Sequence, residues 1–242
     1  VARSLARNAP LNVHFDVTYR CNERCVHCYL DHSDHGEMTT AEIKRVLAEL
    51  AEAGTLFLTF SGGEIFLRPD FFDLLACARR LCFDVTLKTN ALLITEERAA
   101  QLRRLGVRRI QISLYSAHAA IHDAITKVPG SFARTLKALR FCHAQGLLVK
   151  ISCPLMKQNI AVWREVQALA DSLGVTFIMD PTITPMMDGN RSTLDMRLAP
   201  SELLPVMQAP VFDTPAPAKA SGTQMAAAFD NIPCSAGHNS LY

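Results

Sequence analysis

Six short apolar stretches alternate with helical stretches along most of the chain, and this alternation limits the possible folds more than any other feature. Apolar runs predict strands at 11–17, 56–60, 85–88, 109–114, 147–152 and 175–179, and the periodic segments between them predict helices at 40–53, 69–81, 95–105, 131–145 and 161–173. The first helix opens with a capping box, Thr39 with Glu42, and stops at Gly54. Repeated strand–helix units predict an α/β fold with a parallel sheet and right-handed crossovers.

The predicted sheet indicates where a ligand would bind. Because the strands are short and apolar, we expect helices on one face and a packed interior on the other. Sequence order alone fits a doubly wound sheet as well as a barrel, and in both folds ligands bind at the carboxyl ends of the strands. The alternation ends after 179: we expect a long loop over 181–197, a short helix over 201–207 and irregular structure over 209–228, which is rich in Pro and Ala.

Three cysteines, Cys21, Cys25 and Cys28, follow the first predicted strand directly. Three closely spaced thiolates can bind three irons of one iron–sulfur cluster, which usually takes four cysteines. With three protein ligands one metal position stays open, and an open position allows chemistry. Zinc stays an alternative because His27 and His32 lie nearby, although structural zinc sites take four ligands. A disulfide framework fits poorly, since eight cysteines in 242 residues are not dense.

Composition excludes several classes of protein. Apolar residues make up 49% of the chain, which is ample for a large core. The formal net charge of +2 gives no reason to expect nucleic acid or an acidic membrane surface as a partner. No apolar run is long enough to span a bilayer, and the first residues contain no apolar signal segment. A cysteine-rich chain without a targeting segment indicates a protein of the reducing cytoplasm.

A second motif, Gly62-Gly63-Glu64, follows the second predicted strand. Alone, such a motif most often marks a turn, although glycines let the backbone approach a ligand and a carboxylate can pair with an ammonium group. Together with the three cysteines it resembles the motifs of the radical S-adenosylmethionine (radical SAM) enzymes. The resemblance implies a partial (β/α)6 TIM barrel and a [4Fe–4S] cluster on the three cysteines. It also implies that S-adenosylmethionine binds the open iron and that Gly62, Gly63 and Glu64 hold its amino group.

Five further residues match positions that contact the cofactor in this family. The resemblance implies that His27 and Tyr29 lie beside the adenine, although His27 could be a surface histidine or a metal ligand and Tyr29 could simply pack on the loop. Ser113, in the fourth predicted strand, resembles a contact to ribose or carboxylate. Asn90 and Asn159 resemble cofactor contacts too, but a turn residue and an ordinary helix cap explain them equally well.

The remaining cysteines divide into two groups. We expect Cys77, Cys82, Cys142 and Cys153 to be buried, because free cysteine behaves as a small apolar residue. Cys234 differs, since the Cys-x-Ala-Gly that it begins resembles the opening of a SPASM or twitch extension, which holds auxiliary [4Fe–4S] clusters. We therefore expect a radical SAM core over 1–198 and a linker with the start of a truncated SPASM or twitch domain over 199–242.

The resemblance also implies a reaction. The enzyme would cleave S-adenosylmethionine reductively to a 5′-deoxyadenosyl radical, which takes a hydrogen atom from the substrate, with flavodoxin or ferredoxin as the electron donor. Members with a SPASM extension mostly modify ribosomally made peptides or a protein side chain, so a peptide is the first expected substrate. The alternatives are a small molecule or tetrapyrrole as substrate, or an inactive fragment that binds a cluster or zinc.

Overall fold

The computed structural model describes residues 10–33, 35–209 and 240–241. Its strands are β1 (Asn12–Asp16), β2 (Phe57–Ser61), β3 (Asp84–Thr89), β4 (Arg109–Ser113), β5 (Leu148–Pro154), β6 (Thr176–Asp180) and β7 (Ser240–Leu241). Its α-helices are α2 (Thr40–Ala53), α3 (Phe71–Arg80), α4 (Glu96–Arg104), α5 (Ala119–Thr126), α6 (Ser131–Ala144), α7 (Trp163–Ser172) and α8 (Pro200–Met207), and two 3₁₀ turns are η1 (Ile65–Leu67) and η2 (Ser192–Met196).

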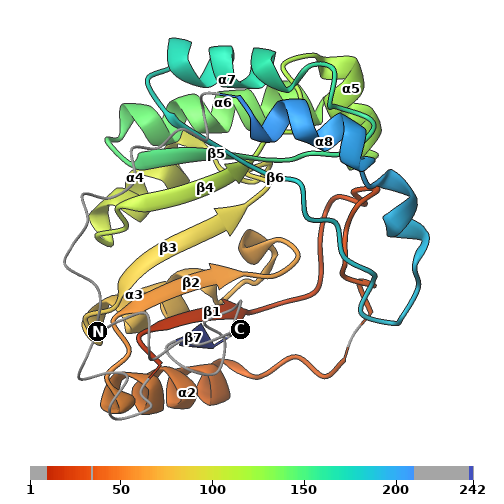
Figure 1. The fold of residues 1–242 in the computed structure, drawn as a ribbon. Coiled ribbons are helices and arrows are strands. Elements are labelled where there is room, and N and C mark those ends of the chain that lie inside the picture. The colour runs from red at the N-terminus through yellow and green to blue at the C-terminus, as the bar shows by residue number, and fades with distance from the viewer. Residues whose placement is uncertain (1–9, 34, 210–239, 242) are drawn as a thin grey trace, which may run out of the picture.

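The strands form one parallel sheet in the order β6-β5-β4-β3-β2-β1-β7. From β1 to β6 this order follows the chain without reversal. Right-handed crossovers between such strands leave all the helices on one side of the sheet, whereas a doubly wound sheet reverses its order and carries helices on both sides. Figure 1 shows α2 below β1 and α6 and α7 above β5, outside a curved sheet. The fold is therefore a partial (β/α)6 barrel, as predicted.

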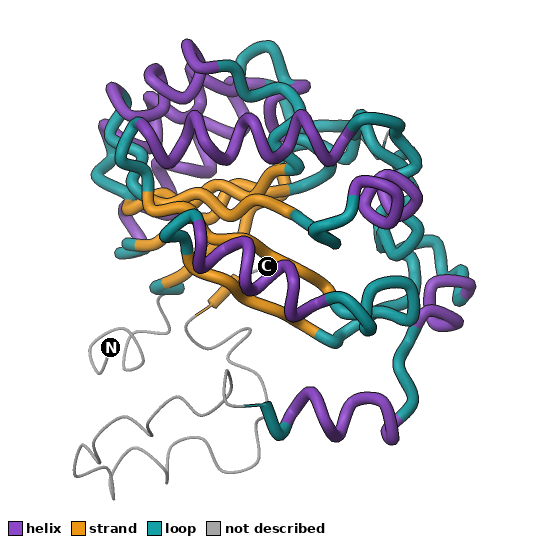
Figure 2. Tube along the Cα trace, turned by 90° about the horizontal axis from the view of Figure 1, so that it is seen from above, coloured by secondary structure: helices purple, strands orange, loops and turns teal. Residues whose placement is uncertain are grey.

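The carboxyl ends of the strands lie level with one another. Asp16 pairs with Ser61, Ser113 with Ser152, and Pro154 with Asp180. In Figure 1 the arrowheads of β2 and β3 point toward the red segment that follows β1, and Figure 2 shows the longer loops gathered at one end of the strands. This end can therefore bring residues from all six strands together.

Side chains alternate between the two faces of each strand. On β3, Val85 and Leu87 are buried under the helices, whereas Thr86 and Lys88 face the interior of the barrel and are only partly buried. The prediction of a packed interior is therefore wrong at the carboxyl ends, because the interior positions there carry polar side chains around a cavity. The apolar core lies between sheet and helices.

Local signals set the helix boundaries well. Thr39 and Glu42 form the predicted capping box of α2, and Gly54 closes the helix with a φ of 95°. Helix α8 confirms the short helix predicted over 201–207, but α5 falls in a stretch for which we predicted no helix. The burial predicted for Cys82 is wrong, because it is exposed with a φ of 66° just beyond the end of α3, and Cys77 is only partly buried. Among the described residues, no helix is long and apolar enough to cross a membrane.

Candidate functional site

A cavity of about 360 Å³ lies at the carboxyl ends of the strands. It is lined by residues from β1 to β6 and from the loops that follow β1, β2, β3, β4 and β6. Nine of these are residues that the sequence predicted for the site: Cys21, Cys25, His27, Cys28, Tyr29, Gly62, Gly63, Asn90 and Ser113. The structure thus brings the cysteine motif, the glycine pair and the predicted polar contacts to one place.

The cysteine loop is tied to the end of α5. The amide of Arg24 donates to the carbonyl of Thr126, and the amide of Val26 donates to that of Ile125, both at 3.0 Å. Within the loop, the amide of Cys28 donates to the carbonyl of Cys25 at 3.0 Å. Helix α5, which we did not predict, therefore holds the loop over the mouth of the barrel.

The three thiols would each have to lose a proton to bind a metal. Burial raises the pKa of Cys21 to about 12 and raises the pKa values of Cys25 and Cys28 as well, so all three are protonated at neutral pH unless a metal replaces the proton. Within the described ranges, no three His, Cys, Asp or Glu side chains converge on a point that could hold a single metal ion. In an iron–sulfur cluster each thiolate binds a different iron, so the three sulfurs need not meet at one point. Three thiols that line one cavity are compatible with such a cluster.

The glycine pair lets two loops meet. The amide of Gly63 donates to the carbonyl of Thr18 at 2.7 Å, and the next amide donates to that of Arg20 at 2.8 Å. A Cβ on Gly62 would lie 2.2 Å from the Thr18 oxygen, and one on Gly63 would lie 2.2 Å from the Arg20 oxygen. Because no side chain fits there, the turn after β2 can support the start of the cysteine loop directly.

Glu64 turns away from the cavity. Its side chain is fully buried and accepts hydrogen bonds from the Thr89 hydroxyl at 2.8 Å, the Asn90 amide at 2.9 Å and the Phe66 amide at 3.1 Å. Burial raises the pKa of Glu64 to about 7 against these donors. In this structure Glu64 joins β2 to β3, and its predicted contact with the cofactor stays a prediction.

The two asparagines have different surroundings. Asn90 lines the cavity, and its side-chain amide donates to Asn22 at 2.7 Å and lies 3.8 Å from the Cys21 sulfur. Asn159 does not line the cavity: its amide donates to the carbonyls of Pro154 and Tyr115 and accepts from the amide of Met156. Asn90 thus orients the cysteine loop, while Asn159 orders the backbone after β5, and neither contact tests the predicted cofactor role.

Two rings lie beside the cysteines. The His27 ring is partly buried, its Nδ1 atom is buried without a partner among the described residues, and burial lowers its pKa to about 4, so the ring is neutral. The Tyr29 hydroxyl donates to Asp16 at 3.1 Å, and its ring is 39% exposed at the rim of the cavity. Both positions suit rings that meet a bound molecule.

Several polar residues of the cavity were not predicted. They are Lys88 of β3, Gln111 of β4, Ser152 of β5 and Asp180 of β6. In β3, β4 and β5, apolar and polar residues alternate around Lys88, Gln111 and Ser152. That alternation could have identified these three, whereas Asp180 follows three apolar residues in β6 and carries no such signal.

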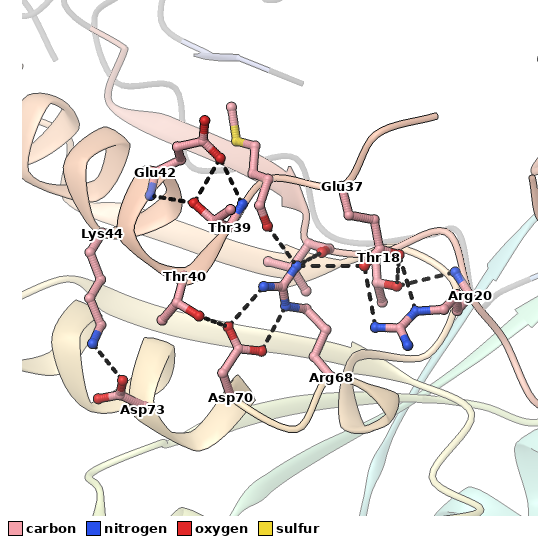
Figure 3. Close-up of polar contacts among 12 residues, drawn as sticks. Thr18, Arg20, Glu37, Thr39, Thr40, Glu42, Lys44, Arg68, Asp70 and Asp73 are labelled. Atoms are coloured by element: carbon pink, nitrogen blue, oxygen red, sulfur yellow. Dashed lines mark hydrogen bonds and ion pairs between the residues drawn. The ribbon is translucent and has the colours of Figure 1, made fainter. Parts of the chain in front are cut away.

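An ion-pair network connects the chain segments that come before and after the three cysteines (Figure 3). The buried Arg68 guanidinium donates to the carbonyls of Val17 and Met38 and forms a two-point ion pair with Asp70. Glu37 lies between Arg68 and Arg20, at 3.7 and 3.3 Å. Arg68 therefore ties the chain after the cysteines to the end of β1.

Comparison with known proteins agrees with this geometry. The model of the Radical SAM superfamily matches residues 15–170. An AdoMet-dependent heme synthase of Methanosarcina barkeri is 34% identical over 182 residues, which cover 72% of this chain and 52% of that protein. The mycofactocin maturase MftC of Mycobacterium tuberculosis is 34% identical over 189 residues, which cover 77% of this chain and 47% of that protein.

A solved structure shows the same fold. Streptococcus suis SuiB bound to S-adenosylmethionine superposes with a TM-score of 0.64 at 20% identity, over 77% of this chain and 43% of that chain. At this identity the likeness concerns the fold alone. The chain spans about half the length of the curated relatives that it matches.

Proposed function

Because this chain belongs to the Radical SAM superfamily, we propose that it is the S-adenosylmethionine-cleaving core of an enzyme that modifies a ribosomally made peptide or a protein side chain. Membership implies a [4Fe–4S] cluster and S-adenosylmethionine as cofactors. The observation that carries the proposal is the convergence of Cys21, Cys25 and Cys28 on one cavity at the carboxyl ends of the strands. When bound, the cofactors supply a 5′-deoxyadenosyl radical that removes a hydrogen atom from the substrate.

In this proposal the residues of the chain bind the cofactor and orient it. Gly62 and Gly63 offer backbone to the amino group of the cofactor, His27 and Tyr29 offer rings to the adenine, and Ser113 offers a hydroxyl. In this proposal Glu64, Asn90 and Asn159 support the site through their contacts with the surrounding chain.

The polar side chains that line the cavity favour a substrate with polar groups. Lys88, Gln111, Ser152 and Asp180 line it, and the Lys88 ammonium group is attracted by the carboxylates of Asp16 and Asp180. Such a polar lining suits the polar backbone and side chains of a peptide better than the broad apolar face of a macrocycle. MftC, named as a maturase, is among the similar proteins.

A tetrapyrrole is the second candidate substrate, because heme synthases are as similar to this chain as MftC is. Other parts of the proposal rest on the sequence. These are a core over 1–198, a linker and SPASM or twitch segment over 199–242, Cys234 as a ligand of an auxiliary cluster, flavodoxin or ferredoxin as reductant, and a place in the cytoplasm. Cys234 lies outside the described residues.

Deuterium transfer separates the two substrates. The peptide fraction of source cells grown in heavy water, and deuterated iron coproporphyrin, would each be incubated anaerobically with reconstituted protein, S-adenosylmethionine and dithionite. We expect mass spectrometry to find deuterium in 5′-deoxyadenosine only with the peptide fraction, and none in either arm with a Cys21/Cys25/Cys28→Ala variant. Deuterium from the porphyrin alone would favour the second candidate, and none from either would contradict both.

A further inference from the structure

Tyr115 stands two residues after the end of β4, and its ring is contacted from two sides. The side chain is 5% exposed. Its ring meets the His27 ring edge-on, with the centroids 4.9 Å apart and the planes at 70°, and it stacks on the His122 ring with the centroids 5.4 Å apart. The ring therefore has one position between these two imidazoles.

The backbone of Tyr115 is fixed as well. Its amide donates to Nδ1 of His122 at 3.2 Å, and its carbonyl accepts from the Asn159 amide at 3.0 Å and from the Cys153 thiol at 3.7 Å. Because Nδ1 of His122 accepts, its ring proton lies on Nε2 and the ring is neutral. The buried side chains of His122 and Asn159 thus hold the backbone of Tyr115 in place.

This placement brings the Tyr115 hydroxyl to 3.6 Å from the Cys25 sulfur. With a thiol, either atom can donate the hydrogen bond. A cysteine that binds iron is a thiolate and has no proton to donate, so the hydroxyl must be the donor.

We propose that the Tyr115 hydroxyl donates a hydrogen bond to the Cys25 thiolate and so raises the one-electron reduction potential of the cluster. A donor stabilises the negative charge that reduction adds, and hydrogen bonds to cluster sulfurs are among the factors that set such potentials. His122 and Asn159 act through Tyr115 as positioning residues. The inference rests on the cluster of the proposed function, and it assigns a role to a residue that the sequence did not single out.

The direct test is Tyr115→Phe, which removes the hydroxyl and keeps the ring. Protein reconstituted anaerobically with iron and sulfide would be titrated with dithionite in the presence of mediators, and the reduced cluster would be followed by electron paramagnetic resonance. We expect the midpoint potential of Tyr115→Phe to be more negative than that of the wild type. Tyr19→Phe is the matched control, because the Tyr19 ring packs on His35 while its hydroxyl has no hydrogen-bond partner in the described chain; its potential should not change.

A second variant covers the case in which Tyr115→Phe does not hold a cluster. 3-Fluorotyrosine at position 115 keeps ring and hydroxyl and is the stronger donor, so the potential should become more positive than in the wild type. Equal potentials in the wild type and in whichever variant holds the cluster would overturn the role of Tyr115 and leave the proposed function intact. A wild type that holds no cluster would overturn both.

Discussion

Gly62→Ala is expected to destabilise the protein by about 3 kcal/mol and to reduce the iron bound after reconstitution. Gly62 has a φ of 128°, and a left-handed backbone costs a residue with a Cβ about 1–2 kcal/mol. The added Cβ would also lie 2.2 Å from the carbonyl oxygen of Thr18, and overpacking adds about 1–3 kcal/mol. The loops after β1 and β2 would have to separate, and the first of them carries the cysteines. Urea unfolding and iron analysis measure both effects.

Gly54→Ala is the matched control. Gly54 also has a positive φ, 95°, but nothing lies within 4 Å of the position that its Cβ would take. This variant should lose about 1–2 kcal/mol from backbone strain alone and should bind iron like the wild type. If the two variants lost the same stability, the close approach of the loops would not be what requires Gly62.

Glu64→Gln is expected to cost about 2 kcal/mol or more even in protein without cofactors. The Phe66 amide donates to Oε1 and the Asn90 amide donates to Oε2. A glutamine has one carbonyl oxygen, so its NH₂ group would face one of these two donors, and a buried donor left unpaired costs about 1–3 kcal/mol. Denaturant unfolding of the cofactor-free protein would measure the loss.

Glu52→Gln serves as the control for this change. Glu52 is exposed near the end of α2, so its replacement should change the stability by less than about 0.5 kcal/mol. If Glu64→Gln were as stable as the wild type and failed only in binding S-adenosylmethionine, Glu64 would be a cofactor contact and not a link between strands.

The sequence predicted the parts of the fold that local signals determine. Thr39 with Glu42 marks the start of α2, and the apolar runs mark all six strands of the partial barrel. Helix α5 carries no such mark: it begins after His118, whose side chain does not cap it. Strand order was open too, because it depends on how strands meet and not on the pattern within each strand.

In the candidate site, too, local features could be predicted from the sequence and long-range contacts could not. The spacing of the three cysteines is local, so their shared place could be predicted. The contacts that organise them join distant parts of the chain: Glu64 bonds Thr89, 25 residues away, and Tyr115 meets Cys25, 90 residues away. One sequence contains no signal for such pairs, since each member alone has the composition of an ordinary turn or core residue.

The most direct test of the central claim is the formation of 5′-deoxyadenosine. Wild type and the Cys21/Cys25/Cys28→Ala variant would be reconstituted anaerobically with iron and sulfide, reduced with dithionite and given S-adenosylmethionine. We expect the wild type to bind a [4Fe–4S] cluster and release 5′-deoxyadenosine, and the variant to do neither. A wild type that binds zinc in place of the cluster, or a variant that still releases the nucleoside, would contradict the assignment of these cysteines.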